Sequence, residues 1–264
     1  MRILRICAIA AFALVTTLLS PPGARADGRL ALEYDAFVAG FPALSFDFEI
    51  ELDKSSYRVT GGARTNGLAD VLMNYRMRTE SDGRVEGTTL RPAAHQTRSD
   101  GHWRLRTTHI VFAGAEIEAE VTPPVDHPLE PDIVAGSLDP LTAILAAGRE
   151  IGAQGRCDQR VKVFDGRRRF DLEFADGGQQ HLQKGFGIFE GAARYCILHL
   201  HKVNGFESDN RKPGTPADVW FASVAEAMPP VPVKLDFNSQ FGWASIYLTE
   251  VKTGAAAPPP APIR

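Results

Sequence analysis

Alternation of apolar and polar residues dominates the sequence and predicts short β-strands. The clearest example runs from Leu44 to Leu52 (LSFDFEIEL), where every second side chain is apolar. Successive side chains of a strand point to opposite faces, so this pattern predicts one buried face and one solvated face. Similar segments before and after it, Leu30 to Phe37 and Tyr57 to Thr60, predict an antiparallel sheet that starts near the N-terminus.

Asp-Gly pairs predict the turns between these strands. Both central residues of a type I′ turn need positive φ, which glycine adopts at little cost. We therefore expect hairpin turns at four places, namely Asp82-Gly83, Asp100-Gly101, Asp165-Gly166 and Asp176-Gly177-Gly178.

A helix is predicted to begin after Asp139. The segment Ser137 to Pro140 places an acid at the N-cap and a proline at the first helical position, and Gly148 predicts the end of the helix. A shorter helical turn is expected over Leu68 to Met73. The longer helix carries one apolar stripe that could plug or cover a sheet, formed by Leu141, Ile144 and Leu145.

About thirteen or fourteen predicted strands with one long helix indicate a mainly β fold. We expect one large antiparallel sheet, curled on itself or forming an open β-barrel, with one or two short helices and one disulfide. Residues 27–253 would form this single domain. Residues 254–264 are rich in alanine and proline and predict a disordered tail.

The first 26 residues predict a secretory signal peptide. Arg2 and Arg5 precede an apolar run from Ile6 to Leu19, and Ala24-Arg25-Ala26 supplies small residues for cleavage. This run of 14 residues is shorter than the roughly 20 that a spanning helix needs, although a retained membrane anchor is the alternative. We expect a periplasmic protein that is not integral to a membrane once the signal is removed.

The charge balance argues against nucleic acid as a partner. The formal net charge of −3 would become −6 without the three arginines of the predicted signal. An acidic chain with scattered arginines lacks the basic surface that phosphate backbones require.

Two cysteines, Cys157 and Cys196, would survive signal removal, while Cys7 would be lost. An even number of cysteines in an oxidising compartment predicts a disulfide. A loop of about 40 residues closed by this bond would gain roughly 4 kcal/mol in the chain-entropy picture. A redox pair is the alternative, but the spacing is not Cys-X-X-Cys and no helix N-terminus lies nearby to lower a thiol pKa.

Aromatic residues are the first candidates for ligand binding, because a wide curled sheet can enclose a cavity. Ordinary core packing is the alternative for each of them. The candidates on alternating segments are Phe46, Phe48, Trp103, Phe170, Phe174 and Trp220.

Three consecutive arginines form a second candidate site. Arg167, Arg168 and Arg169 follow the predicted turn at Asp165, and guanidinium groups suit phosphate or carboxylate ligands. Arg167 and Arg169 are the candidate ligand-binding residues of this group. The alternative is a solvated hairpin in which the arginines pair with acids across the strands, such as Asp171 or Glu173.

His199 and His201 are two residues apart on a predicted strand and therefore share a face. This spacing occurs in metal sites, but no carboxylate or cysteine lies at a matching local spacing, so no metal is predicted. Structural or surface histidines are the favoured interpretation. A third ligand could come from His95, His102, His109 or His181.

Motifs of common enzymes are absent from the sequence. It contains no Gly-X-Ser-X-Gly, no P-loop, no dinucleotide fingerprint and no His-Glu-X-X-His. No cofactor is therefore predicted, and an enzyme is unsupported.

Short segments, taken in order, resemble an exported bacterial family called domain of unknown function 3108. The resemblance extends over nearly all of the chain after the predicted signal. It implies an exported β-rich protein, and it transfers no catalytic residue. The layout also looks distantly like the open or spiral β-barrels of periplasmic lipoprotein carriers and envelope-integrity proteins. The matching segments are Thr65 to Leu68, Leu90 to Pro92, Leu138 to Leu141, Cys157 with Val163 to Phe170, Cys196, Asn204 to Phe206, Val219-Trp220 and Pro232-Val233.

Three functions are consistent with these features. The leading hypothesis is a non-enzymatic periplasmic protein that serves the cell envelope by binding an apolar ligand, such as a lipid or a lipoprotein, inside the barrel. The first alternative is a scaffold that docks a periplasmic protein through a strand edge or the proline-rich tail. The second is an uncharacterised hydrolase, which requires a cleft with perturbed ionisable groups.

Overall fold

The computed structural model describes residues 28–101, 105–114, 116–126, 128–206, 214–239 and 241–254. In this part of the chain, thirteen strands form one antiparallel sheet in the order β7-β6-β5-β4-β3-β2-β1-β13-β12-β11-β10-β9-β8. The predicted mainly β fold with one broad sheet is confirmed. The strands are β1 (Gly28–Val38), β2 (Phe41–Leu52), β3 (Ser56–Thr65), β4 (Arg76–Glu86), β5 (Thr89–Asp100), β6 (Arg106–Ala113), β7 (Glu116–Thr122), β8 (Gln159–Phe164), β9 (Arg169–Leu182), β10 (Gly191–Asn204), β11 (Ala217–Ala222), β12 (Val231–Ser239) and β13 (Gly242–Thr253).

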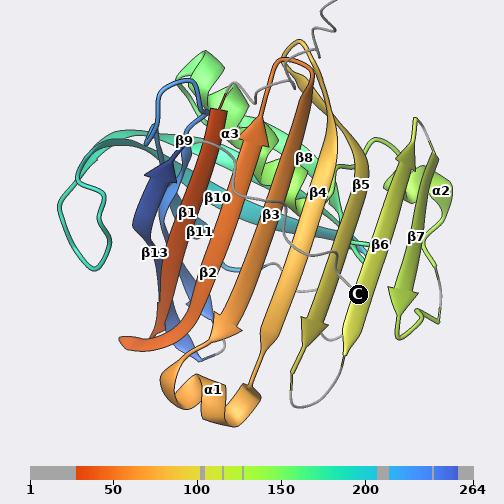
Figure 1. Ribbon diagram of the computed structural model, residues 1–264, viewed down its shortest axis with the longest axis horizontal. Helices are drawn as coiled ribbons and strands as arrows, with labels where there is room; N and C mark the ends of the chain where they lie inside the picture. The colour runs from red at the N-terminus through yellow and green to blue at the C-terminus, as the bar shows by residue number, and fades with distance from the viewer. Residues whose placement is uncertain are drawn as a thin grey trace, which may run out of the picture.

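The sheet curls so that its first half, β2 to β7, faces its second half, β8 to β13 (Figure 1). The halves are joined by β1, which pairs with both β2 and β13. No ladder joins the edge strands β7 and β8 among the described residues, so the barrel is open in its hydrogen bonding. Side chains close this seam instead. Phe164 of β8 packs against Ile110 of β6, and Gly166 in the β8–β9 turn approaches Thr108 and Val121.

Helix α3 (Pro140–Gln154) lies between the two halves of the sheet (Figure 1). It contacts β4 and β5 on one side and β8 and β12 on the other. Asp139 caps it as predicted, because its side chain accepts hydrogen bonds from the backbone N of Leu141 and Thr142, both at 3.0 Å. The helix therefore plugs the curled sheet.

The predicted end of α3 at Gly148 was wrong. The helix continues to Gln154 and ends at Gly155, whose φ of +69° is typical of a helix C-cap. A Cβ atom at Gly148 would lie only 2.2 Å from the carbonyl oxygen of Pro230. Gly148 thus lets the helix pack closely on the segment before β12, and it does not stop the helix.

Two of the four predicted Asp-Gly turns were also wrong, because both glycines lie inside strands. A Cβ at Gly83 of β4 would lie 2.2 Å from Arg91 O, and one at Gly177 of β9 would lie 2.2 Å from the Tyr195 ring. Each glycine permits close approach of a neighbouring strand. The β4–β5 turn lies at Gly87 instead, with φ of +61°.

The Asp165-Gly166 turn is confirmed between β8 and β9, and Asp100 ends β5. The expected short helix is present as α1 (Gly67–Met73). A further short helix that the pattern did not predict, α2 (Pro131–Val134), lies near β7.

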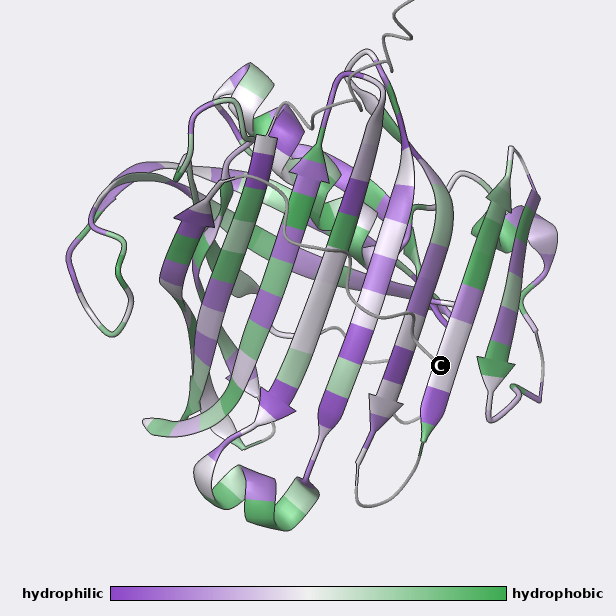
Figure 2. Cartoon of the chain, in the orientation of Figure 1, coloured by the Kyte–Doolittle hydropathy of each residue, from purple (hydrophilic) through white to green (hydrophobic). Residues whose placement is uncertain are grey.

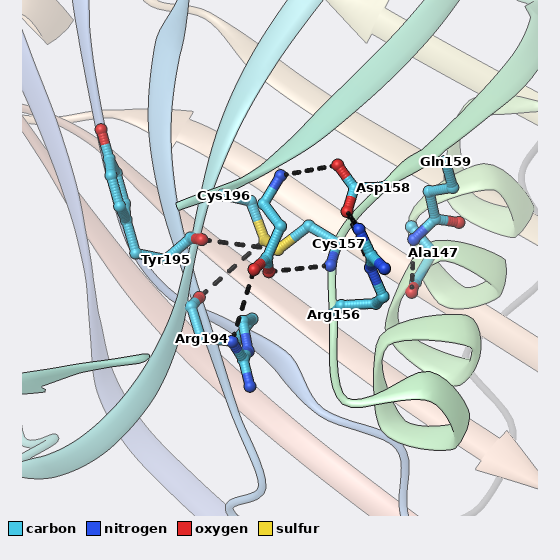
Figure 3. The surroundings of a disulfide bond; sticks show 9 residues. Ala147, Arg156, Cys157, Asp158, Gln159, Arg194, Tyr195 and Cys196 are labelled. Carbon is cyan, nitrogen blue, oxygen red and sulfur yellow. Dashed lines mark hydrogen bonds and ion pairs between the residues drawn. A yellow bond between two sulfur atoms is a disulfide. The ribbon is translucent and has the colours of Figure 1, made fainter. Parts of the chain in front are cut away.

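Cys157 and Cys196 form the predicted disulfide, with their Cα atoms 5.8 Å apart (Figure 3). Both cysteines are fully buried. The backbone N of Cys157 also donates to Asp176 Oδ1 at 3.0 Å. Since Cys157 follows α3 closely and Cys196 lies on β10, the bond ties the C-terminal end of the plug to the second half of the sheet.

The predicted signal (residues 1–26) and most of the predicted tail (residues 255–264) lie outside the described residues. Within the described part, no helix is long and apolar enough to cross a membrane.

Candidate functional site

An apolar cavity lies beneath α3, between the two halves of the sheet. Its volume is about 270 Å³. The lining comes from α3, from β1, from β2 and β3 of the first half, and from β9 to β13 of the second half. Most of the lining side chains are aliphatic or aromatic, and Lys234 is the one charged residue among those described.

The alternating pattern of β2 builds one wall of the cavity. Phe46, Phe48 and Ile50 point inward, while the intervening polar residues lie on the opposite face. The rings of Phe46 and Phe48 are nearly parallel, with centroids 6.4 Å apart. Tyr34 of β1 packs edge-on against Phe48 at 5.9 Å.

The second half of the sheet supplies the opposite wall. Phe174 of β9 and Phe221 of β11 are almost completely buried and pack edge-to-face, with centroids 6.0 Å apart. Val219 of β11 lies beside them. The predicted stripe of α3 forms the roof, since Leu141, Ile144 and Leu145 all line the cavity.

Polar groups are few at the cavity and are already hydrogen-bonded or ion-paired. The hydroxyl of Tyr34 donates to Pro232 O at 2.9 Å, and burial raises the pKa of Tyr34 far above its usual value, so the phenol stays neutral. The Nζ of Lys234 lies 2.8 Å from Asp236 Oδ2 and 4.5 Å from the Trp220 ring centroid. The cavity therefore offers apolar contact with a single cation at its margin.

The aromatic residues predicted from the sequence divide between this cavity and other positions. Phe46, Phe48 and Phe174 line it. Trp220 does not, because its ring stacks on Tyr195 at 5.2 Å and its Nε1 donates to Gln180 Oε1 at 2.8 Å. The remaining two candidates are Phe170, which packs near Phe206 at 6.5 Å, and Trp103, which lies outside the described residues.

The arginine cluster lies at the β8–β9 turn, away from the cavity. Arg169 is buried and forms an ion pair with Asp171. Arg168 pairs with Asp165 at 2.7 Å, and Arg167 donates to Pro123 O at 2.7 Å. Two of the three arginines thus pair with acids of the same hairpin, although not across its strands, and the third is hydrogen-bonded to a backbone carbonyl.

Ion pairing also affects the acid in this hairpin. Burial alone would raise the pKa of Asp171, but hydrogen bonds and charge from Arg169 and Arg160 hold it below its ordinary value. Asp171 therefore remains ionised and neutralises the arginines beside it.

His199 and His201 share a face, as expected, with ring centroids 6.2 Å apart. The Nε2 of His201 lies 3.0 Å from Glu173 Oε2. Across the described ranges, no three histidine, cysteine or acidic residues are grouped in a way that could hold a metal ion.

A buried polar network between α3 and the sheet was missed by the sequence analysis. Ser81 Oγ donates to Asp139 Oδ1 at 2.6 Å and lies 2.8 Å from His95 Nδ1. Thr97 Oγ1 lies 3.0 Å from His95 Nε2 and 2.8 Å from Thr79 Oγ1. Ser81, His95 and Asp139 are at most 4% exposed.

This network contains the residue types of a hydrolase triad in a different arrangement. Serine bridges histidine and aspartate here, whereas a nucleophilic site needs histidine between the other two. None of the three is accessible to a substrate. The network instead holds the N-terminus of α3 on β4 and β5.

Asp139 is ionised within this network. Burial alone would raise its pKa, but hydrogen bonds and charge from His95, with hydrogen bonds from Ser81 and Thr142, lower it below the ordinary value. The polar residues at inward-facing positions of two alternating strands, Ser81 and His95, were the signal that could have revealed the network from the sequence.

Comparisons with known proteins agree with this architecture. A family described as "Protein of unknown function (DUF3108)" matches residues 33–249. No curated protein matches the sequence. A similar solved structure is that of a β-barrel-like protein of domain of unknown function DUF1849 from Brucella abortus, with a TM-score of 0.56 and 9% identity, covering 86% of this chain and 98% of that chain. At this identity the likeness shows the fold alone.

Proposed function

Because the chain belongs to the DUF3108 family, whose function is unknown, we propose a function from the cavity itself: the protein binds an apolar ligand beneath α3. The acyl chain of a lipid or of a lipoprotein has the required chemistry. The observation that carries this proposal is a cavity of about 270 Å³ with almost entirely apolar walls.

The energetics of an empty apolar cavity favour occupancy. Side chains that line an unfilled cavity lose dispersion contacts, and water gains too few hydrogen bonds there to replace them. A cavity of about 150 Å³ lined by similar side chains is known to bind benzene. The larger cavity under α3 therefore suits a slender apolar group, and binding would stabilise the fold.

The proposed location is the periplasm, where the ligand would come from the cell envelope. The apolar N-terminal segment with its small-residue cleavage motif supports export. The buried Cys157–Cys196 disulfide is compatible with an oxidising compartment. In this role the protein would act as a carrier or receptor and not as an enzyme.

Purification after export from a bacterial host tests the proposal. We expect native mass spectrometry to show added mass that organic extraction removes, and we expect the extracted protein to bind parinaric acid. Protein that is always empty and does not bind the probe would refute the proposal.

A cavity-filling variant locates the binding. Ile144→Trp places a larger side chain in the cavity roof and should weaken parinaric acid binding by about tenfold or more. The matched control is Val203→Trp, because Val203 is exposed on β10 outside the cavity, and its binding should equal that of the wild type. Equal weakening by both variants would place the ligand elsewhere.

A further inference from the structure

One end of the curled sheet carries exposed apolar side chains from three separate segments. Phe41, Leu68, Val71 and Leu72 are each 70–78% exposed. Such large apolar side chains are normally buried, and a cluster of them on a surface marks an interaction site. We call this cluster the apolar tip, and it consists of Phe41, Leu68, Val71, Leu72, Met73, Phe241 and Trp243.

Backbone hydrogen bonds hold the three segments of the apolar tip side by side. Asn66 N, just before α1, donates to Ala43 O of β2 at 2.9 Å. Ala39 N in the β1–β2 turn donates to Trp243 O at 2.9 Å. The β1–β2 turn therefore lies between α1 and the β12–β13 turn. Figure 1 shows α1 at this end of the sheet, and Figure 2 shows its apolar residues beyond the strand ends.

Polar contacts, and not burial, fix the orientation of α1. None of its residues is buried. The Asp70 carboxylate accepts from Arg76 Nη1 at 2.6 Å and from Thr65 Oγ1 at 2.8 Å. Asn74 ends the helix in the left-handed conformation, with φ of +42°. Leu68, Val71 and Leu72 are spaced i, i+3 and i+4, so one apolar face of a firmly held helix points to solvent.

Basic side chains lie at the same end of the sheet, on the β3 to β6 side of the apolar tip. Arg64, Arg98 and Arg106 lie at this end of β3, β5 and β6, and none of them forms an ion pair with another described residue. Two more arginines here are paired, Arg76 with Asp70 and Arg78 with Asp47. The same end also carries four acids, Asp35, Asp47, Asp70 and Asp100. The five arginines therefore leave a small positive excess at this end, whereas the full chain has a net charge of −3.

We propose that the apolar tip docks the protein onto a lipid bilayer that contains anionic phospholipid. Leucine, phenylalanine and tryptophan side chains at the boundary of headgroup and acyl chains, with arginines among the headgroups, are typical of interfacial binding. The inference goes beyond the proposed ligand binding and does not depend on it, since its residues are separate from the cavity lining.

Trp243 provides a direct readout, because its indole is 53% exposed within the tip. The full chain is mixed with vesicles of phosphatidylglycerol and phosphatidylcholine that carry a brominated acyl chain. Subtracting the fluorescence of the Trp243→Phe variant from that of the wild type isolates the emission of Trp243. We expect bromine to quench this emission, and we expect vesicles of phosphatidylcholine alone to quench it less. Absence of quenching would overturn the proposal, even if another part of the chain retains the protein on vesicles.

Substitutions on α1 supply the second readout. The triple variant Leu68→Ser, Val71→Ser and Leu72→Ser should lower the vesicle partition measured by Trp243 quenching by about tenfold or more. The matched control is Ile133→Ser with Leu200→Ser, two exposed apolar residues outside the tip, and it should partition as the wild type does. If the triple variant fails to fold, Phe41→Ser with Phe241→Ser tests the same surface.

Other occupants of the tip give distinct results. If Trp243 of the triple variant is quenched like that of the wild type, the apolar face of α1 does not contact the bilayer, and the proposed docking through the apolar tip is wrong. If sedimentation shows a wild-type dimer that the triple variant converts to a monomer, with vesicle partition unchanged, a second copy of the chain covers the tip, and the membrane proposal is wrong.

Discussion

At the scale of the residue, Asp139 has three roles. Its carboxylate caps α3, accepts a hydrogen bond from Ser81 and lies 3.4 Å from His95 Nδ1. The contacts with Ser81 and His95 join the plug helix to the sheet. One of the two carboxylate oxygens has no protein partner in the described structure. Removal of the carboxylate would leave buried donors unpaired, which costs more than the loss of an exposed cap.

The variant Asp139→Ala should destabilise the fold by about 2–4 kcal/mol. Asp139→Asn retains the size of the side chain and the cap, and should cost less than Asp139→Ala. Urea unfolding at neutral pH measures both values. Equal stability of Asp139→Ala and the wild type would show that the network does not hold α3.

The lowered pKa of Asp139 should also make the stability of the fold depend on pH. The pKa of Asp139 is lowered in the fold from its ordinary value of 3.8, so the unfolded chain binds the proton more readily. The stabilisation from the ionised carboxylate is therefore complete above about pH 5 and is lost as the pH falls through the folded pKa. The stability difference between the wild type and Asp139→Asn should shrink below about pH 4, as measured by urea unfolding at several pH values. A difference that grows on acidification would contradict this.

A second residue-scale prediction concerns Gly148. Alanine favours helices over glycine by about 1 kcal/mol, yet its Cβ would lie 2.2 Å from Pro230 O. We expect the clash to dominate, so that Gly148→Ala destabilises the protein by about 1–3 kcal/mol in thermal or urea unfolding. Gly185→Ala is the control, because open space surrounds that position. This variant should be about as stable as the wild type.

At the scale of the element, local patterns predicted the strands but not all of their ends. The alternation of Leu44 to Leu52 depends only on neighbouring residues, and β2 contains it completely. The role of Gly83, in contrast, depends on Arg91 across the sheet, and the role of Gly148 within α3 depends on Pro230. Contacts between residues far apart in the sequence leave no local signal, which explains these errors.

At the candidate site too, the sequence predicted the residues that follow a local alternation but not the contacts between distant segments. Phe46 and Phe48 follow the alternation of β2 and face the cavity. Trp220 is buried too, but it stacks on Tyr195 across the sheet and does not line the cavity. The network of Ser81 and Asp139 joins positions 58 residues apart, which no spacing rule detects.

The disulfide yields a prediction for the elements that it joins. The bond constrains the unfolded chain over a sequence separation of 39 residues, so Cys157→Ala with Cys196→Ala should cost about 2–4 kcal/mol. Urea unfolding of the wild type with a reductant should show a similar loss, and the double variant should be insensitive to the reductant. Unchanged stability of the double variant would show that the bond adds nothing to the packing of α3.

At the scale of the whole molecule, two features determine the architecture. They are the seam between β7 and β8, which no ladder of the described residues closes, and α3, which plugs the curled sheet. The two halves of the sheet are joined by hydrogen bonds at β1 and only by side chains between β8 and β6–β7. The exposed edge of β7 carries Glu116, Glu118 and Glu120, charges that oppose pairing with another strand.

A crystal structure of the protein soaked with a brominated fatty acid tests most directly whether the cavity beneath α3 binds an apolar ligand. We expect anomalous bromine density between α3 and β2, in contact with Phe46, Phe48 or Ile144. Bromine density that appears only on the outer surface, or a cavity that remains empty in crystals with the fatty acid bound elsewhere, would contradict it.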